Sequence, residues 1–292
     1  MGFWNVLFGG SEQSPEEEKK AQEAKNFDLL KYDGVKAMKM GQTDYAVRCF
    51  REALKLTDDL ETRDYLSQAL LRQGQLDDAQ AELRLLAEAE PGNAAIWKRI
   101  AQVAFMQEDY AAMAAACEQA MQIDAADAQA CFLDAQAQRG QGNMVGAIAM
   151  LTKAITLDAN YGDAYLMRAQ MLLAMGDTAG ADSDATWLTD NAAEHEDVLL
   201  LKARVETAKG NDEAAIGIYD RVTEVNPFSI EAFRERGQLK YNRGDKAGAE
   251  ADMQTVLELD PNSLADVNGD YSAEGIEQRV RQAYSAINPL GL

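Results

Sequence analysis

Apolar residues recur at helical spacing along this chain, in pairs of short runs. Between Ala94 and Met106 they occupy positions 97, 100, 101, 104 and 105, which lie on one face of a helix. A polar turn follows at residues 107–109, and a second apolar stripe then extends from Tyr110 to Met121. The next stretch repeats this order, with its turn at Gly142. The pattern predicts repeated units of helix, tight turn and helix.

The predicted turns return with a period of 34 residues. A glycine marks them at 74, 142, 176, 210 and 244, with Glu108 in place of glycine and Gly41 one residue out of step. Glycine suits such a turn because it tolerates the positive φ that ends many helices. A second series keeps the same period at Pro91, Ala125, Ala159, Ala193, Pro227 and Pro261. A period of this length indicates an array of repeats.

Small residues stand at fixed places in these units, where two helices must approach closely. In the first helices they are Gly34, Ser67, Ala101, Ala135, Ala169, Ala203 and Gly237. In the second helices they are Ala46, Ala79, Ala147, Ala181, Ala215 and Ala249, with Met113 as the exception. This layout resembles the tetratricopeptide repeat. The resemblance implies an all-α fold, a right-handed α-solenoid of helix-turn-helix repeats.

Seven repeats are expected, at residues 27–59, 60–93, 94–127, 128–161, 162–195, 196–229 and 230–263. Residues 1–26 are expected to form an apolar peg followed by an acidic linker or helix. Residues 264–292 are expected to form a turn, a C-terminal capping helix and a tail. Within the array, a hinge is predicted at 190–197, because the fifth unit has the small Ala185 and Thr189 at core positions and its loop lacks proline.

The resemblance also implies that the first helix of each unit lines a concave, partner-binding face. The ninth position of these helices holds Val35, Gln68, Gln102, Gln136, Gln170, Arg204 and Gln238. Such a row of amides could bond the main chain of an extended peptide, although glutamine also suits any wet helix surface. Other candidates for this face are Lys98, Arg99, Phe105, Phe132, Arg139, Leu166 and Arg234. They favour a partner with apolar anchors and acidic character, unless part of the apolar set belongs to the core.

The net charge of −21 argues against nucleic acid and anionic membrane surfaces as partners. Three cysteines without paired spacing indicate a reducing compartment, so a cytoplasmic protein is expected, with no secretory signal at its start. Of the residues that clamp a chaperone tail in some related proteins, only Lys31 and Arg99 are matched, so this partner is not expected. The partner is therefore expected to be another protein or peptide, and homo-oligomerisation stays open.

No catalytic constellation is visible, so no enzyme and no cofactor are expected. The single histidine, His195, is expected to be a solvated loop residue. Residues 266–277 carry part of a calcium-loop pattern, but Tyr271 replaces its required glycine, so an Asn-Gly turn is favoured and no metal is expected.

Two functions follow. The first is a non-enzymatic scaffold that binds a protein or peptide in the concave face. The alternative is a self-associating or membrane-peripheral assembly factor that acts through the apolar N-terminus, where Phe3, Trp4, Leu7 and Phe8 share one helical face.

Overall fold

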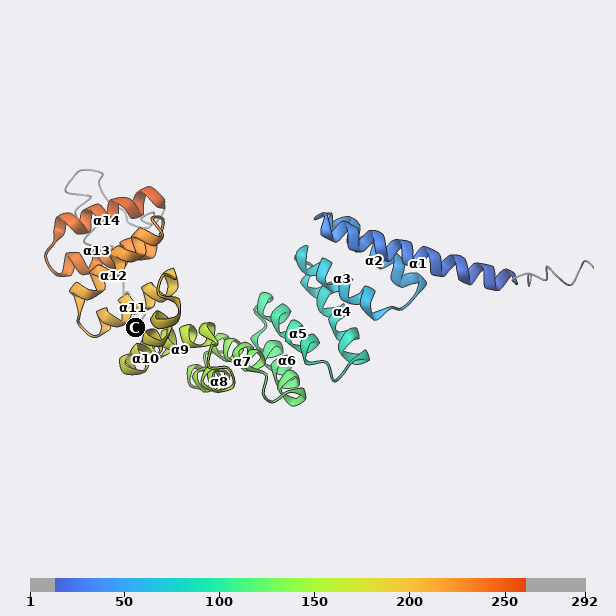
Figure 1. The fold of residues 1–292 in the computed structure, drawn as a ribbon, viewed down its shortest axis with the longest axis horizontal. Coiled ribbons are helices and arrows are strands. Elements are labelled where there is room, and N and C mark those ends of the chain that lie inside the picture. Colours follow the sequence, from blue (N-terminus) through green and yellow to red (C-terminus); the bar gives the residue numbers. More distant parts are fainter. Residues whose placement is uncertain (1–13, 261–292) are drawn as a thin grey trace, which may run out of the picture. The chain divides into compact units, whose positions relative to one another are not determined.

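The computed structural model describes residues 14–260, which form helices in seven consecutive pairs and contain no strand (Figure 1). The first four pairs are α1 (Pro15–Lys39), α2 (Thr43–Leu56), α3 (Leu60–Arg72), α4 (Leu76–Ala89), α5 (Ala94–Met106), α6 (Tyr110–Ile123), α7 (Ala128–Gly140) and α8 (Met144–Leu157). The last three are α9 (Gly162–Ala174), α10 (Thr178–Ala192), α11 (Glu196–Ala208), α12 (Asp212–Val225), α13 (Ile230–Asn242) and α14 (Lys246–Leu259). The predicted all-α solenoid of helix-turn-helix repeats is confirmed.

The turns inside the pairs have the backbone conformation that their period predicts. Gly142 has a φ of 78°, and the other five glycines of the series are also positive. Glu108, the exception in the sequence, adopts a φ of 57° and is the one described non-glycine residue with positive φ. The geometry of the array therefore imposes the left-handed turn even where the residue disfavours it.

The first helix begins well before the first predicted repeat. Ser14 and Glu17 form a capping box, and Pro15 opens the helix. The acidic run 16–18 therefore lies in the first turn of α1, where it complements the helix dipole. The acidic linker considered for residues 1–26 is helical from Pro15 onward. The apolar peg, the predicted capping helix and the loop 266–277 lie outside the described residues.

Small side chains let the two helices of a pair approach closely. A Cβ on Gly34 would meet the ring of the buried Phe50 at 2.5 Å, so α1 and α2 are in contact without room for a methyl group. Ala101, Ala135, Ala169 and Ala203 are fully buried at the equivalent place. Within residues 37–137 the core continues from pair to pair, since one apolar cluster joins α1 to α4 and another joins α4 to α7.

The chain divides after Asn143 into two compact units. In the first unit, α1 packs on α3 and α5 packs on α7, and in the second α9 packs on α11. No two consecutive second helices of the described chain have comparable contact. In these three places, neighbouring repeats therefore approach each other more closely through their first helices than through their second helices.

The fifth repeat does not have the loose core on which the predicted hinge depends, so that premise is wrong. Trp187 stacks on Tyr165 with ring centroids 3.9 Å apart, and Leu188 is buried. One apolar cluster contains Ala185 of α10 together with Val198 and Leu201 of α11, so these neighbouring helices share a core. The larger side chains of adjacent positions fill the space that Ala185 leaves. The first part of the predicted hinge, up to Ala192, is also helical.

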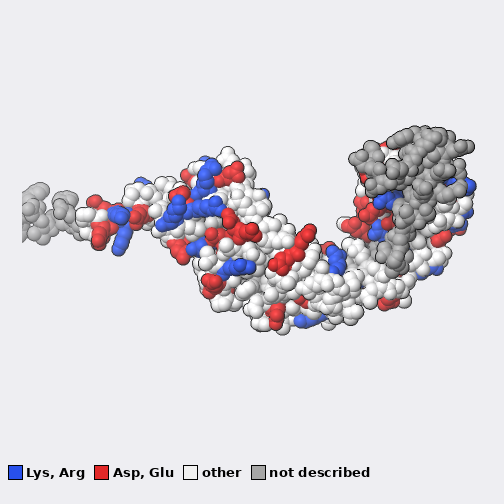
Figure 2. Space-filling view, turned by 180° about the vertical axis from the view of Figure 1, so that it is seen from behind, with Lys and Arg blue, Asp and Glu red and all other residues white. Residues whose placement is uncertain are grey.

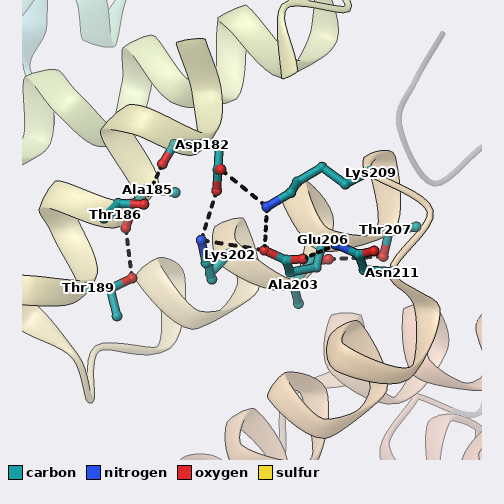
Figure 3. Close-up of polar contacts among 10 residues, drawn as sticks. All are labelled: Asp182, Ala185, Thr186, Thr189, Lys202, Ala203, Glu206, Thr207, Lys209 and Asn211. Carbon is teal, nitrogen blue, oxygen red and sulfur yellow. Dashed lines mark hydrogen bonds and ion pairs between the residues drawn. The ribbon is translucent and has the colours of Figure 1, made fainter. Parts of the chain in front are cut away.

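Ion pairs and hydrogen bonds also connect α10 with α11, beside their shared apolar core (Figure 3). Asp182 of α10 accepts from Lys202 at 2.8 Å and from Lys209 at 3.2 Å. Glu206, which is buried, accepts from Lys209 at 2.9 Å and from Asn211 at 2.7 Å. We call these five residues the α10–α11 network. It links α10 to α11 directly, next to the shared apolar core.

Candidate functional site

The glutamines predicted to face a partner fall into two groups. Gln68 donates to Asp64 of its own helix at 2.8 Å, and the buried Gln238 donates to Asn242 at 2.9 Å. Gln102 and Gln170 are exposed and Gln136 is half-buried. Within residues 14–260 the amides of these last three have no hydrogen-bond partner. Because the members of the predicted row differ in this way, only three of its glutamines keep their amides available to an incoming chain.

The predicted basic flanks are largely neutralised by carboxylates of the neighbouring repeat. Lys98 of α5 contacts Asp127, the residue that caps α7, at 2.6 Å. Arg99 bonds backward to Asp64 of α3 and donates to Ser67 at 2.6 Å. Arg204 of α11 binds Glu235 of α13 through both carboxylate oxygens, and its other contact is Glu231 at 2.6 Å. These cations therefore join consecutive first helices.

The electrostatics agree with a structural role for these pairs. Burial opposes ionisation of Asp127, but bonds from Lys98 and the backbone of Ala130 lower its pKa overall. The Lys31 and Tyr65 bonds lower the pKa of Glu61. Burial would lower the pKa of Arg204, but its two glutamates raise it, so the Arg204 guanidinium stays charged at neutral pH. Figure 2 shows basic and acidic side chains side by side on the face that it displays.

The apolar candidates and the two remaining cations are placed differently. Phe105 is 40% exposed beside Met106, which is 55% exposed, and the Phe105 ring packs edge-on against Tyr110. Phe132 and Leu166 are half-buried, and Leu166 packs against the core shared by α9, α10 and α11. Arg139 is exposed and Arg234 is half-buried, and neither forms an ion pair with another described residue. Within the first unit, α5 therefore presents the exposed Phe105 and Gln102, and α7 presents the half-buried Phe132 and Gln136.

A second set of charged residues was missed in the sequence. Arg168 binds the buried Asp184 through two nitrogens, at 2.8 and 2.7 Å. Arg236 does the same with the buried Asp252, at 3.0 and 2.6 Å. In both pairs the aspartate follows the arginine by 16 residues, which places one on each helix of a pair. That repeated spacing was the available signal.

No group of His, Cys, Asp and Glu that could hold a metal occurs within residues 14–260. His195 is exposed at the start of α11, with its Nδ1 3.8 Å from Asp197. The three cysteines are free and buried, and burial raises the pKa of Cys117 to about 12, so its thiol stays protonated. In the described part of the chain, no helix combines the length and the apolar character that crossing a bilayer requires.

Comparisons with known proteins agree with this architecture. Models of the tetratricopeptide repeat match residues 60–103 and two overlapping stretches, 166–230 and 200–264. No curated protein matches the sequence.

Among solved structures, a tetratricopeptide repeat protein from Parabacteroides merdae is 13% identical, with a TM-score of 0.67 over 89% of this chain and 99% of its own. PilF of Pseudomonas aeruginosa is 16% identical, with a TM-score of 0.59 over 77% of this chain and 100% of its own. YrrB, described as having an unusual peptide-binding site, is 15% identical, with a TM-score of 0.53 over 62% of this chain and 93% of its own. With its paired helices, its 34-residue period and these matches, the chain belongs to the tetratricopeptide repeat family.

Proposed function

We propose that this protein is a non-enzymatic scaffold that binds an extended segment of another protein on the first-helix face of its first unit. The observation that carries the proposal is the combination of amides and aromatic surface on α5 and α7. Gln102 and Gln136 occupy equivalent positions of consecutive repeats, and Phe105, on the same helix as Gln102, is 40% exposed. Amides one repeat apart suit the main chain of an extended peptide, and exposed aromatic surface supplies anchor contacts.

The pairing of the cations changes the expected partner. Lys98 and Arg99 already bind carboxylates, so a partner's acidic residue would have to displace an existing ion pair. The binding free energy would then come chiefly from main-chain hydrogen bonds and apolar contacts. A partner of marked acidic character is therefore no longer favoured on this unit.

The test is affinity capture from native lysate with quantitative mass spectrometry, using the full chain and two double variants. In the first, Gln102→Ala is combined with Gln136→Ala. The matched control combines Gln80→Ala on α4 with Gln122→Ala on α6, which removes the same groups from second helices of the same unit.

The affinity for partners retained by the wild type should fall about thirtyfold in the first variant, since two lost hydrogen bonds cost about 1 kcal/mol each. The control should retain them, and both variants should unfold at nearly the wild-type temperature. Equal retention by the two variants would place the binding surface elsewhere.

A further inference from the structure

A pocket of about 340 Å³ lies between the second and third repeats of the first unit. Its lining combines apolar and acidic side chains. Leu86 and Ile96 are almost fully buried, whereas Leu60 is 37% exposed. Three carboxylates also line the pocket, Glu61, Asp64 and Glu90, and Arg99 is its single cation. The pocket therefore offers hydrocarbon walls together with negative charge.

Two of these carboxylates are already neutralised. Asp64 bonds Arg99, and its other oxygen accepts from Gln68 at 2.8 Å. Glu61 accepts from Lys31 at 2.6 Å and from Tyr65 at 2.9 Å. Each of the two is paired with a cation, although Lys31 is shared with Asp59 at 2.9 Å, so two cations serve three carboxylates here. Glu90 is different, because its hydrogen-bond donor is the neutral amide of Asn93 at 2.8 Å, and no described Lys or Arg pairs with it.

The surplus negative charge of Glu90 also lies at an unfavourable place in its own helix. Glu90 is the C-terminal cap of α4, and the last turn of that helix contains no basic residue. The C-terminus of a helix carries a partial negative charge, so a carboxylate there is repelled and a cation is attracted. Glu90 and the end of α4 therefore both favour a positive group at the pocket.

A long basic side chain fits this combination. Lysine and arginine lay their methylene stems along apolar surface while the charged head reaches a carboxylate. Leu60 and Ile96 supply the apolar surface, and Glu90 supplies the unneutralised carboxylate. An acidic side chain would meet net negative charge, and an apolar one would leave Glu90 without a counter-charge.

We propose that this pocket recognises a lysine or arginine of the extended segment bound on the first-helix face. The inference rests on the proposed function, since the same segment would continue from α5 toward α3. It specifies the chemistry of the partner as a basic residue flanked by uncharged and apolar ones. This reverses the acidic character expected from the sequence.

The probe is a library of random decapeptides displayed on phage and selected on the immobilised full chain. The variant Glu90→Gln removes the charge and keeps the shape of the side chain. Glu88→Gln is the matched control, because Glu88 is exposed on the same helix but does not line the pocket. Peptides selected by the wild type and by the control should be enriched in Lys and Arg, and peptides selected by Glu90→Gln should lose most of that enrichment.

One selected peptide is then measured by fluorescence anisotropy in its original form and with its basic residue changed to Gln. The wild type and Glu88→Gln should bind the basic form about three- to fivefold more tightly, and Glu90→Gln should bind the two forms alike. Circular dichroism checks that both variants are folded.

Each other outcome is decisive. Peptides selected without excess Lys and Arg would leave the proposed function standing and overturn the basic pocket. An equal loss of basic preference in Glu88→Gln and Glu90→Gln would assign the preference to the general charge of −21 and overturn the pocket as well. The absence of any selected peptide would contradict the proposed function, and the pocket inference with it.

Discussion

At the scale of single residues, the turn series shows how the array imposes a backbone conformation. Glu108 occupies the place that glycine takes in the other repeats, and it adopts the same left-handed conformation with a φ of 57°. Residues with a Cβ pay roughly 1 kcal/mol or more in that region. The packing of α5 on α6 therefore outweighs the local preference of this residue.

Exchanging residues within this series should separate backbone strain from side-chain contacts. Glu108→Gly should stabilise the protein by about 0.5–1 kcal/mol, because it relieves the positive φ at a smaller cost in chain entropy. Gly142→Ala should destabilise it by about 1 kcal/mol through strain alone, since a Cβ there would meet nothing within 4 Å. Urea unfolding measures both changes. Stabilisation by Gly142→Ala would show that φ at these turns is unimportant.

At the scale of helices, ion pairs connect neighbouring repeats, which the sequence pattern shows only as separate units. Lys98 to Asp127 and Arg204 to Glu235 each join consecutive first helices. Arg168 to Asp184 and Arg236 to Asp252 instead join the two helices of one pair. The last two pairs therefore occupy equivalent positions two repeats apart, and most of the cations considered for partner binding stabilise the stack instead.

The α10–α11 network should protect the junction at which the sequence predicts a hinge. Asp182→Asn removes the charge that holds Lys202 and Lys209, and should destabilise the protein by less than about 1 kcal/mol, because the pairs are partly exposed. Hydrogen exchange of the α11 amides should accelerate by up to about fivefold in this variant.

Asp190→Asn is the control for the α10–α11 network, because Asp190 is exposed and forms no ion pair with another described residue. It should leave the exchange of α11 unchanged. In the wild type, α10 and α11 should exchange as slowly as α9. Rapid exchange of α10 in the wild type, with first proteolytic cleavage between residues 192 and 197, would restore the hinge.

At the scale of the whole molecule, carboxylates act in two opposite ways. Their excess gives a net negative charge that repels itself, whereas those that form ion pairs stabilise the fold. Bonds from Lys202 lower the pKa of Asp182 against the opposing effect of burial. Burial raises the pKa of Glu206, but Asn211 and Lys209 lower it overall. The net charge of −21 gives a repulsion that weakens as the pH approaches the isoelectric point near 4.4. As the pH falls, the repulsion therefore weakens first, and the ion pairs of these carboxylates are lost only at lower pH.

The pH dependence of unfolding should reveal the contribution of the ion-paired carboxylates, such as Asp182 and Glu206. Because their pKa values are lower in the folded state, their contribution is complete above the unfolded values, near 3.8 for Asp and 4.5 for Glu, and is lost as the pH falls through the folded values. The urea midpoint should thus fall steeply below about pH 4. Asp127→Asn keeps an oxygen to cap α7 but loses the Lys98 pair, so this variant should show a flatter fall. If the urea midpoint of the variant falls with pH as steeply as that of the wild type, the Lys98–Asp127 pair does not contribute to this pH dependence.

The sequence by itself determined the repeat period, the helix pairs, the small contact positions and the left-handed turns. These features are local, because each depends on residues within one repeat and recurs often enough to stand out. The same pattern identified the first-helix positions but did not show whether the side chains there are already hydrogen-bonded within the protein. Gln68 and Gln102 look equivalent in sequence, yet only Gln68 is bonded within its helix.

Only the tertiary structure decided which charged residues are already paired and where a pocket remains. The partners of Lys98, Arg99 and Arg204 lie about a repeat away in the chain, so their pairing depends on how neighbouring repeats are stacked. The same stacking gives the fifth repeat a full core, since Ala185 shares one apolar cluster with Val198 and Leu201 of the next helix. Glu90 carries no signal in the sequence, and it is the fold that places this exposed residue at a pocket with apolar walls between α3, α4 and α5. Local periodicity fixes the repeats, whereas contacts between repeats fix the charge and the shape available to a partner.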